Sequence, residues 1–278
     1  MRRLFARPML WFLPVVIIPL GALLVMQYRF LRTLEQKSVS AERNWLRGAL
    51  ESVASEVEEK YRAAATSSLR LTHVQLLSVG TLGRHFREHP VPAARLYFTM
   101  HFDGSKVMPG YWDAHGFEKK PDWPETEAAK MATLGWHVAH KWDRVVADPA
   151  LQVDERDPKH RVIVRPVLDE SMHVVGVAGV VLDEHLAKKS ISSIASGVFK
   201  QRYPSRMMTV RVGELPASMR REWVTQPLGF VFTNWRLAIR DGCSTPEQLA
   251  AHGFRSNMMW TGGVFVVLLG ALGLAAGA

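Results

Sequence analysis

The sequence predicts an α+β protein in which two transmembrane helices flank a domain built on an antiparallel sheet, with a long helix in front of the sheet. Three features of the 278-residue chain lead to this prediction: an uncharged apolar run near each end, helical periodicity after the first run, and paired strand patterns between the runs. The expected organisation, in residue numbers, is a cytoplasmic N-terminus at 1–7, a first transmembrane helix at 8–28, a stalk helix at 29–68, the folded domain at 69–257 and a second transmembrane helix at 258–278.

The two apolar runs, residues 8–28 and 258–278, contain no charged side chain. About 20 helical residues cover the ~30 Å hydrocarbon core of a bilayer, and a helix satisfies its own backbone groups in lipid. A cleaved signal peptide is the competing interpretation of the first run, because Arg2, Arg3 and Arg7 precede it. The run is longer than the roughly 7–15 residues of a signal-peptide core and no A-x-A-like site follows it, so we expect an uncleaved span.

The formal net charge of +9 does not indicate a nucleic-acid-binding protein. The basic residues are scattered among acidic ones, and no basic stripe alternates with stacking aromatic residues. Positive charge close to a span bears instead on orientation. The arginines before Pro8 favour a cytoplasmic N-terminus, whereas Arg29, Arg32 and Lys37 oppose it. The only cysteine, Cys243, cannot form a disulfide within the chain.

A single long amphipathic helix is expected after the first run. Residues 29–68 contain no proline and one glycine, Gly48. Apolar positions recur every three or four residues, at Leu46, Leu50, Val53, Val57, Tyr61 and Ala64. This stripe packs either on its own domain or on a second copy in a parallel coiled-coil-like contact, and the periodicity does not separate the two.

Strand and turn patterns follow the stalk. The expected elements, in order, are a helical stretch at 69–88, hairpin strands at 95–102 and 106–112, a helical piece at 125–134, strands at 161–168 and 173–182, a helix at 184–199, and strands at 208–212 and 230–240. Residues 113–158 are rich in tryptophan, histidine and charge, so we expect the ligand-facing loop there.

The order of these elements resembles the extracytoplasmic Cache (PAS-like) input domains of bacterial membrane sensors. The resemblance is most specific from Pro166 to Leu186, where "P-V-L-D", a turn and "V-V-G-V-A-G-V-V-L-D" lead into a helix. Residues 235–239, before the second run, look like the closing strand of sensor histidine kinases. The resemblance implies a homodimer in the bacterial inner (plasma) membrane, with the domain outside the cytoplasm and ligand binding transmitted by movement of the two membrane helices.

The function implied by the resemblance is signal input, with a histidine kinase of a two-component system as the expected parent. The chain contains none of the nucleophile, phosphate-loop or metalloprotease motifs, and neither the phosphoacceptor helix nor the ATP-binding domain of such a kinase. A cytoplasmic response regulator is a partner only if a kinase core follows. The alternative is a membrane-anchored assembly protein that binds a protein partner and no small molecule.

Two kinds of candidate ligand-binding residue emerge. Asp183 matches an aspartate that contacts the ligand amine in amino-acid-binding relatives, although their tyrosine, arginine and tryptophan pattern is not recognisable here. The favoured alternative is that Asp183 caps the helix that begins at Glu184. Aromatic and histidine side chains supply the apolar walls and polar tips of a pocket, and this set comprises Tyr97, His101, Tyr111, Trp136 and His137. Strand alternation places Tyr97 and His101 on one face. An ordinary core is the competing interpretation.

Two histidine pairs at helical spacing, His85 with His89 and His137 with His140, are candidate metal ligands. Neither pair has a cysteine or an acidic third ligand in its pattern, so we expect surface histidines and no metal. The sequence likewise predicts no cofactor and no direct nucleic-acid partner. The expected partners are membrane lipid, a second copy and a small molecule of unknown identity.

Overall fold

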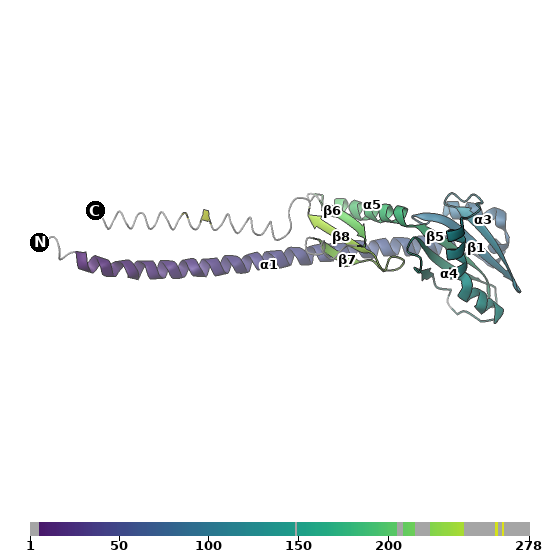
Figure 1. Cartoon of the computed structure of the whole chain (residues 1–278), viewed down its shortest axis with the longest axis horizontal. Coiled ribbons are helices and arrows are strands. Elements are labelled where there is room, and N and C mark those ends of the chain that lie inside the picture. Colours follow the sequence, from purple (N-terminus) through teal and green to yellow (C-terminus); the bar gives the residue numbers. More distant parts are fainter. Residues whose placement is uncertain are drawn as a thin grey trace. The chain divides into compact units, whose positions relative to one another are not determined.

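The protein is described from a computed structural model that covers residues 6–147, 149–204, 208–214, 223–241, 259–260 and 263 (Figure 1). The chain divides into two compact units, and each is described separately below. One comprises Met1–Gly48 and Arg240–Ala278, and the other comprises Ala49–Ile239. The second unit contains the candidate site.

Helix α1, Ala6–Leu69, is continuous over 64 residues, so the helix after the first apolar run is an extension of the same helix (Figure 1). Within the described residues, no helix combines the length and hydropathy needed to cross a membrane. The second apolar run, residues 258–278, lies outside the described residues except at 259–260 and 263. Both predicted spans therefore stay predictions.

The apolar stripe of α1 is buried within the second unit. Leu50, Val53, Val57 and Tyr61 are each no more than 1% exposed in a single copy. Ala64 is half-buried, and Ala65 takes the fully buried position at that turn. Of the two alternatives for this stripe, packing on its own domain is the one that the structure supports between Leu50 and Tyr61.

The main sheet is antiparallel, with five strands in the order β2-β1-β5-β4-β3. Its strands are β1 (Ala94–Asp103), β2 (Lys106–Asp113), β3 (Gln152–Asp154), β4 (His160–Leu168) and β5 (Val174–Asp183). The β1–β2 and β4–β5 hairpins are as predicted. At the first turn, Gly104 has φ of +58°, a conformation that glycine adopts without strain. The α+β class is confirmed.

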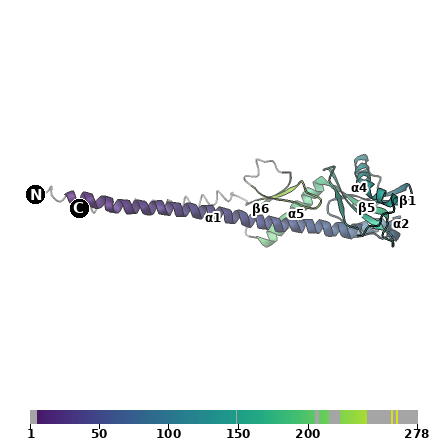
Figure 2. The same cartoon turned by 90° about the horizontal axis from the view of Figure 1, so that it is seen from below.

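Different helices cover the two faces of this sheet (Figure 2). Helix α4 (Trp123–Lys141) packs on the face that carries Leu96, Phe98 and Val181. The opposite face is covered by α2 (His73–Leu77) and α3 (Val79–Glu88). The ring of Phe86 in α3 stacks on that of Tyr97, 4.6 Å between centroids. Strand alternation thus assigns each β1 side chain to one of two cores.

The prediction of a single helical stretch over residues 69–88 is wrong, because this segment contains two separate helices. Leu69 ends α1, and α2 begins only after Thr72, whose hydroxyl accepts from Gln75 N at 3.2 Å while the Gln75 side chain accepts from Thr72 N at 2.9 Å. This reciprocal capping box starts a new helix. Ser78 then separates α2 from α3. The piece predicted at 125–134 is also too short, since α4 extends over 19 residues.

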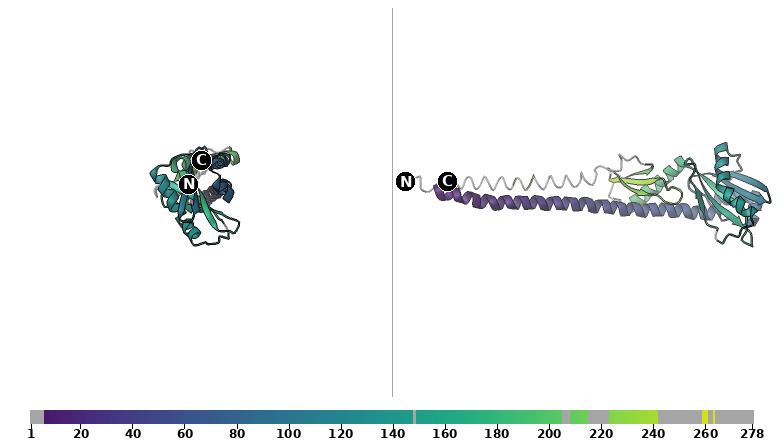
Figure 3. Two further views of the ribbon diagram at one scale, coloured as in Figure 1. Left: turned by 90° about the vertical axis from the view of Figure 1, so that its right-hand side faces the viewer. Right: turned by 60° about the horizontal axis from the view of Figure 1, so that its bottom comes forward.

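A second sheet follows α5 (Glu184–Arg202) (Figure 3). It is formed by β6 (Met208–Gly213), β7 (Val224–Pro227) and β8 (Arg236–Asp241) in the order β6-β8-β7. The predicted strand at 230–240 begins instead at Arg236. Phe230 has φ of +55°, and Phe232 N donates to Gly229 O at 3.1 Å, so residues before β8 form turns. Strand β7 was not predicted.

Candidate ligand-binding site beneath α4

The N-terminal half of α4 and the β3–β4 hairpin enclose a groove of about 380 Å³, which we call the α4 groove. Pockets for small molecules range from about 300 to 1,000 Å³, so this volume suits a compact ligand. The groove is lined by Trp123, Pro124, Glu127, Ala128, Met131, Asp154, Arg156, Asp157, His160 and Val162. Most of these residues come from the segment 113–158, where the ligand-facing region is predicted.

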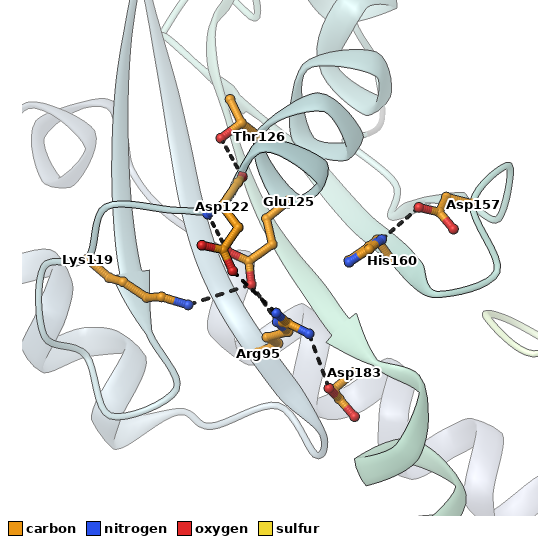
Figure 4. Close-up of polar contacts among 8 residues, drawn as sticks. All are labelled: Arg95, Lys119, Asp122, Glu125, Thr126, Asp157, His160 and Asp183. Carbon is orange, nitrogen blue, oxygen red and sulfur yellow. Dashed lines mark hydrogen bonds and ion pairs between the residues drawn. The ribbon is translucent and has the colours of Figure 1, made fainter.

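The start of α4 is fixed by a buried carboxylate. Glu125 lies three residues after the N-cap Asp122 and is 0% exposed. One of its oxygens, Oε2, accepts from Asp122 N at 3.0 Å. The other, Oε1, accepts from Arg95 Nε at 2.5 Å and lies 3.6 Å from Lys119 Nζ (Figure 4). A buried charge is stable only with such partners.

Arg95 reaches Glu125 because the strand is irregular at that point. The register of β1 against β5 shifts between Ala94 and Leu96, which is the signature of a bulge. A bulge re-aims a side chain that regular alternation would send to the other face. The guanidinium of Arg95 also lies 3.6 Å from carboxylate oxygens of Asp122 and Asp183 (Figure 4). Arg95 therefore connects the start of α4 with the end of β5.

The Glu125 carboxyl is held ionised. Burial alone would raise its pKa, but the hydrogen bonds from Asp122 N and Arg95, together with the charges of Lys119 and Arg95, outweigh burial and lower the pKa. Charge-assisted hydrogen bonds are roughly twice as strong as neutral ones. These contacts hold the start of α4 in place beside the groove. The ion-pair cluster comprises Arg95, Lys119, Asp122, Glu125 and Asp183.

Asp183 is the N-cap of α5, as the favoured alternative predicted. Its Oδ1 accepts from Leu186 N at 2.8 Å, while Oδ2 faces Arg95. Its Cα partner across the sheet is His160, which lines the α4 groove. Contact between Asp183 and a ligand stays a prediction.

Two ion pairs border the groove on the β3–β4 hairpin. Arg156 Nε donates to both carboxylate oxygens of Asp154, at 2.9 and 3.0 Å, and this bond chiefly lowers the pKa of Asp154. His160 Nδ1 lies 2.7 Å from Asp157 Oδ2 (Figure 4). Burial would raise the pKa of Asp157, but hydrogen bonds from His160 and Lys159 N lower it. Both carboxylates are therefore ionised.

Charge around the groove is unbalanced. Three carboxylates, those of Glu127, Asp154 and Asp157, face one guanidinium and one imidazole among the lining residues. Apolar surface is contributed by Ala128, Met131, Val162 and the indole of Trp123. A groove of this composition favours a cation with an apolar body.

Tyr97 and His101 share the face covered by α2 and α3, as alternation predicts. Tyr97 is fully buried, its hydroxyl oxygen accepts from Val91 N at 2.7 Å, and burial raises its pKa. The ring of His101 lies 6.2 Å from that of His73, and its Nδ1 is buried without a hydrogen-bond partner among the described residues. Tyr97 thus has the ordinary core role that was the competing interpretation.

Tyr111 on β2 and Trp136 and His137 on α4 lie on the other side of the sheet. Tyr111 and Trp136 pack against the core there, and the His137 ring is 5.2 Å from that of Phe102. Trp136 Nε1 and His137 Nε2 are buried without hydrogen-bond partners in the part of the chain that the structure describes. The sheet separates these residues from Tyr97 and His101, so the six predicted residues do not line one pocket. Their contact with a ligand stays a prediction.

Three of the four histidines in the two pairs have backbone hydrogen-bond partners. His85 Nε2 is 3.0 Å from Ser68 O, His89 Nδ1 is 3.0 Å from His85 O, and His140 Nδ1 is 2.7 Å from Val174 O. Across the described ranges, no group of three or more histidine, cysteine or acidic residues is placed to hold a metal ion.

Comparisons with known proteins give matches among solved structures only. No protein-family model matches the sequence, and no curated protein matches it. The periplasmic sensory domain of the Campylobacter jejuni chemoreceptor Tlp1 aligns with 76% of this chain and 93% of its own, at 10% identity and a TM-score of 0.31.

Two further structures are similar in the same way. The ligand-binding domain of the Pseudomonas aeruginosa PAO1 amino-acid chemoreceptor PctC, solved with GABA, aligns with 71% of this chain and 98% of its own, at 14% identity and a TM-score of 0.33. A methyl-accepting chemotaxis protein X aligns with 75% and 96%, at 12% identity and a TM-score of 0.29. Each score is too low for residues or ligands to be transferred between the proteins.

Proposed function

We propose that this chain is the input part of a membrane-anchored sensor, in which a small amine with an apolar body binds the α4 groove. The strongest support for this proposal comes from the β3–β4 hairpin, which contacts both the groove and the turns of the second sheet. Asp154, Arg156, Asp157 and His160 line the groove. Their neighbours in the chain contact the turns that precede β8 in the second sheet. One short segment therefore connects the groove to the element nearest the second apolar run.

The contacts on the far side of the hairpin are specific. The Glu155 carboxylate accepts from Thr233 N at 3.1 Å and from the Thr233 hydroxyl. Arg161 is 2% exposed, and its guanidinium lies 4.4 Å from the centroid of the Trp235 ring. Lys188 of α5 approaches the same ring at 5.3 Å. Cation–π contacts of buried groups contribute about 2 kcal/mol, enough to hold the turn against the hairpin.

A ligand transmits a signal only through different affinities for two states. In the proposed mechanism, a ligand amine competes with His160 and Arg156 for the carboxylates of Asp157 and Asp154. Weakening these ion pairs changes the conformation of the hairpin, and Glu155 and Arg161 carry that change to residues 229–239. Because Asp183 caps α5 and pairs with Arg95, the start of α5 is held beside the same site.

The cellular setting is also proposed, on the basis of the sequence. Two uncharged runs of spanning length support a membrane anchor at each end, and the resemblance of residues 166–186 to Cache domains supports a location outside the cytoplasm of the bacterial inner membrane. The same resemblance supports a histidine kinase as the output. Reporter fusions at residue 150 test the location: alkaline phosphatase activity without a cytoplasmic reporter signal is expected, and the reverse pattern contradicts it.

Ligand binding is tested on the full chain in detergent micelles by thermal shift, with tyramine and putrescine as cationic probes and benzoate and succinate as anionic ones. At a hundred times the dissociation constant, binding stabilises by about 2.7 kcal/mol, which raises the Tm of a domain of this size by roughly 5–10 °C. Met131→Trp fills the groove and should abolish the shift. Leu77→Trp, at an exposed position on α2, should leave it intact. Shifts with anions only, or shifts unaffected by Met131→Trp, contradict the proposal.

A further inference from the structure

An unpaired apolar stripe follows the outer face of α4. Its members are Met131, Leu134 and Val138 on α4 and the C-cap residue Trp142, which are 41%, 56%, 44% and 70% exposed. Their spacing of three or four residues places them on one side of the helix, away from the side that packs on the sheet, and Met131 also lines the edge of the α4 groove. Contiguous exposed apolar side chains on a folded domain mark an interaction surface.

Gly135 lies within this stripe, at an exposed position in the interior of α4. A methyl group added there would meet nothing within 4 Å, so packing in its own chain does not require a glycine. Glycine in a helix interior costs about 0.5–1 kcal/mol relative to alanine. A glycine at this position does allow another backbone to approach closely. The centre of the stripe therefore has room for a second helix to cross in close contact.

We propose that this outer stripe of α4 is the interface with a second copy of the chain, in which the two α4 helices pack antiparallel and cross at Leu134 and Gly135. In that arrangement Met131 packs on Val138 of the partner subunit. The exposed Trp123 at one end lies opposite Val145 of the partner subunit. Met131, Val138, Trp123 and Val145 of one copy thus each meet an apolar side chain of the other, in the reciprocal way that a twofold interface requires.

Charge agrees with this self-pairing. Glu127 lies about two turns before the crossing and Lys141 about two turns after it. Antiparallel packing brings Glu127 next to Lys141 of the partner subunit, twice per dimer because the contact is symmetric. A parallel arrangement would instead place each charge beside its own counterpart. The positions of Glu127 and Lys141 therefore favour a second copy of the chain as the partner and an antiparallel orientation of the two helices.

The available area is sufficient for a stable contact. A standard interface buries about 800 Å² per partner. Trp123 and Trp142 are 74% and 70% exposed, and with about 200 Å² for each indole they supply roughly 300 Å². Met131, Leu134, Val138 and the flanking charged side chains add the remainder. Dimerisation would also place Trp142 of the partner subunit beside Glu127, at the edge of the α4 groove.

Disulfide formation between copies tests the interface locally, in membranes that contain the full chain with Cys243→Ser. Leu134→Cys lies at the crossing, and Leu186→Cys, at an exposed leucine on α5, is the matched control. Dimers should form at least about tenfold faster at position 134. Adding Val138→Asp should reduce the rate at 134 to that of the control. Equal rates at the two positions, or no effect of Val138→Asp, overturn the proposal, including the case in which another protein covers the stripe.

The charge pairing is tested in the Leu134→Cys chain. Glu127→Lys should slow disulfide formation several-fold, and Lys141→Glu alone should do the same. The double variant should restore the original rate, because both pairs reform with reversed charge. Slow crosslinking in the double variant contradicts the antiparallel pairing. Unchanged helical circular dichroism in every variant separates these outcomes from unfolding.

Discussion

Replacing the buried carboxylate at the start of α4 provides the sharpest test of how the site is held. Glu125→Gln keeps the shape of the side chain but removes the charge that Arg95 and Lys119 contact. Breaking a fully buried ion pair costs about 3–5 kcal/mol, and loss of a hydrogen bond to a charged group about 1.5–3 kcal/mol. Arg95 and Lys119 are 38% and 35% exposed, so water recovers part of the loss. We expect a loss of about 2–3 kcal/mol.

The assay is urea unfolding of the full chain in micelles, with Glu127→Gln on the exposed side of the same helix as the control. The urea midpoint should fall at an unchanged slope, and the Tm should fall by roughly 4–12 °C. Glu127→Gln should change the free energy of unfolding by less than about 0.5 kcal/mol. A Glu125→Gln chain as stable as the control would refute the view that this cluster anchors α4.

The pH dependence of the same variant has a defined sign. The pKa of Glu125 is lowered in the folded protein, so its carboxylate stabilises the fold fully above the unfolded value of about 4.3. That contribution is lost as pH falls through the lower folded pKa. Glu125→Gln should therefore lose less stability than the unmodified chain on acidification below about pH 4. An equal loss of stability in the two chains at acidic pH would contradict this role of the Glu125 carboxylate.

Substitutions at three further positions separate packing from charge. Gly176→Ala places a methyl group 2.5 Å from Met100 O in the neighbouring strand, so we expect a loss of about 1–3 kcal/mol in urea unfolding. Gly197→Ala, in the exposed interior of α5 with nothing within 4 Å, should gain about 0.5–1 kcal/mol, and a loss there would contradict the helix assignment. Asp183→Ala should cost about 1–2 kcal/mol through loss of the cap, whereas Asp183→Asn should cost less than half as much, because an amide oxygen still accepts from Leu186 N. Equal losses would assign the role to the ion pair with Arg95.

The elements that the sequence predicted well are those with strong local signals. The β1–β2 hairpin combines alternating apolar residues with a glycine in the left-handed region, and α5 begins at an aspartate that caps it. Strand β7 has only four residues and ends in a proline, so it depends on pairing with β8 and has no periodicity of its own. The break after Leu69 was missed because a capping box at Thr72 looks like polar helix sequence.

The candidate site was predicted less completely than the fold. Residue type indicated the aromatic and histidine side chains as candidates. The face of the sheet on which each one lies depends on strand alternation in the two hairpins and on the position of α4 against the sheet. Arg95 was not a candidate because a bulge, invisible in the sequence, turns it toward α4. Glu125 carried a usable signal: an aspartate followed three residues later by a glutamate, at the start of a helix, predicts a capping pair.

In the proposed function, the β3–β4 hairpin connects the α4 groove to the turns before β8. Hydrogen exchange on the full chain in micelles, with and without saturating tyramine, measures this connection directly. We expect slower exchange both at residues 152–160 and at residues 229–239 when tyramine is bound. Arg161→Met removes the guanidinium from the Trp235 ring but leaves Glu155 bonded to Thr233, so the change at 152–160 should remain and the change at 229–239 should become smaller. Protection confined to the hairpin in the unmodified chain, or an unchanged response at 229–239 in Arg161→Met, would contradict the account.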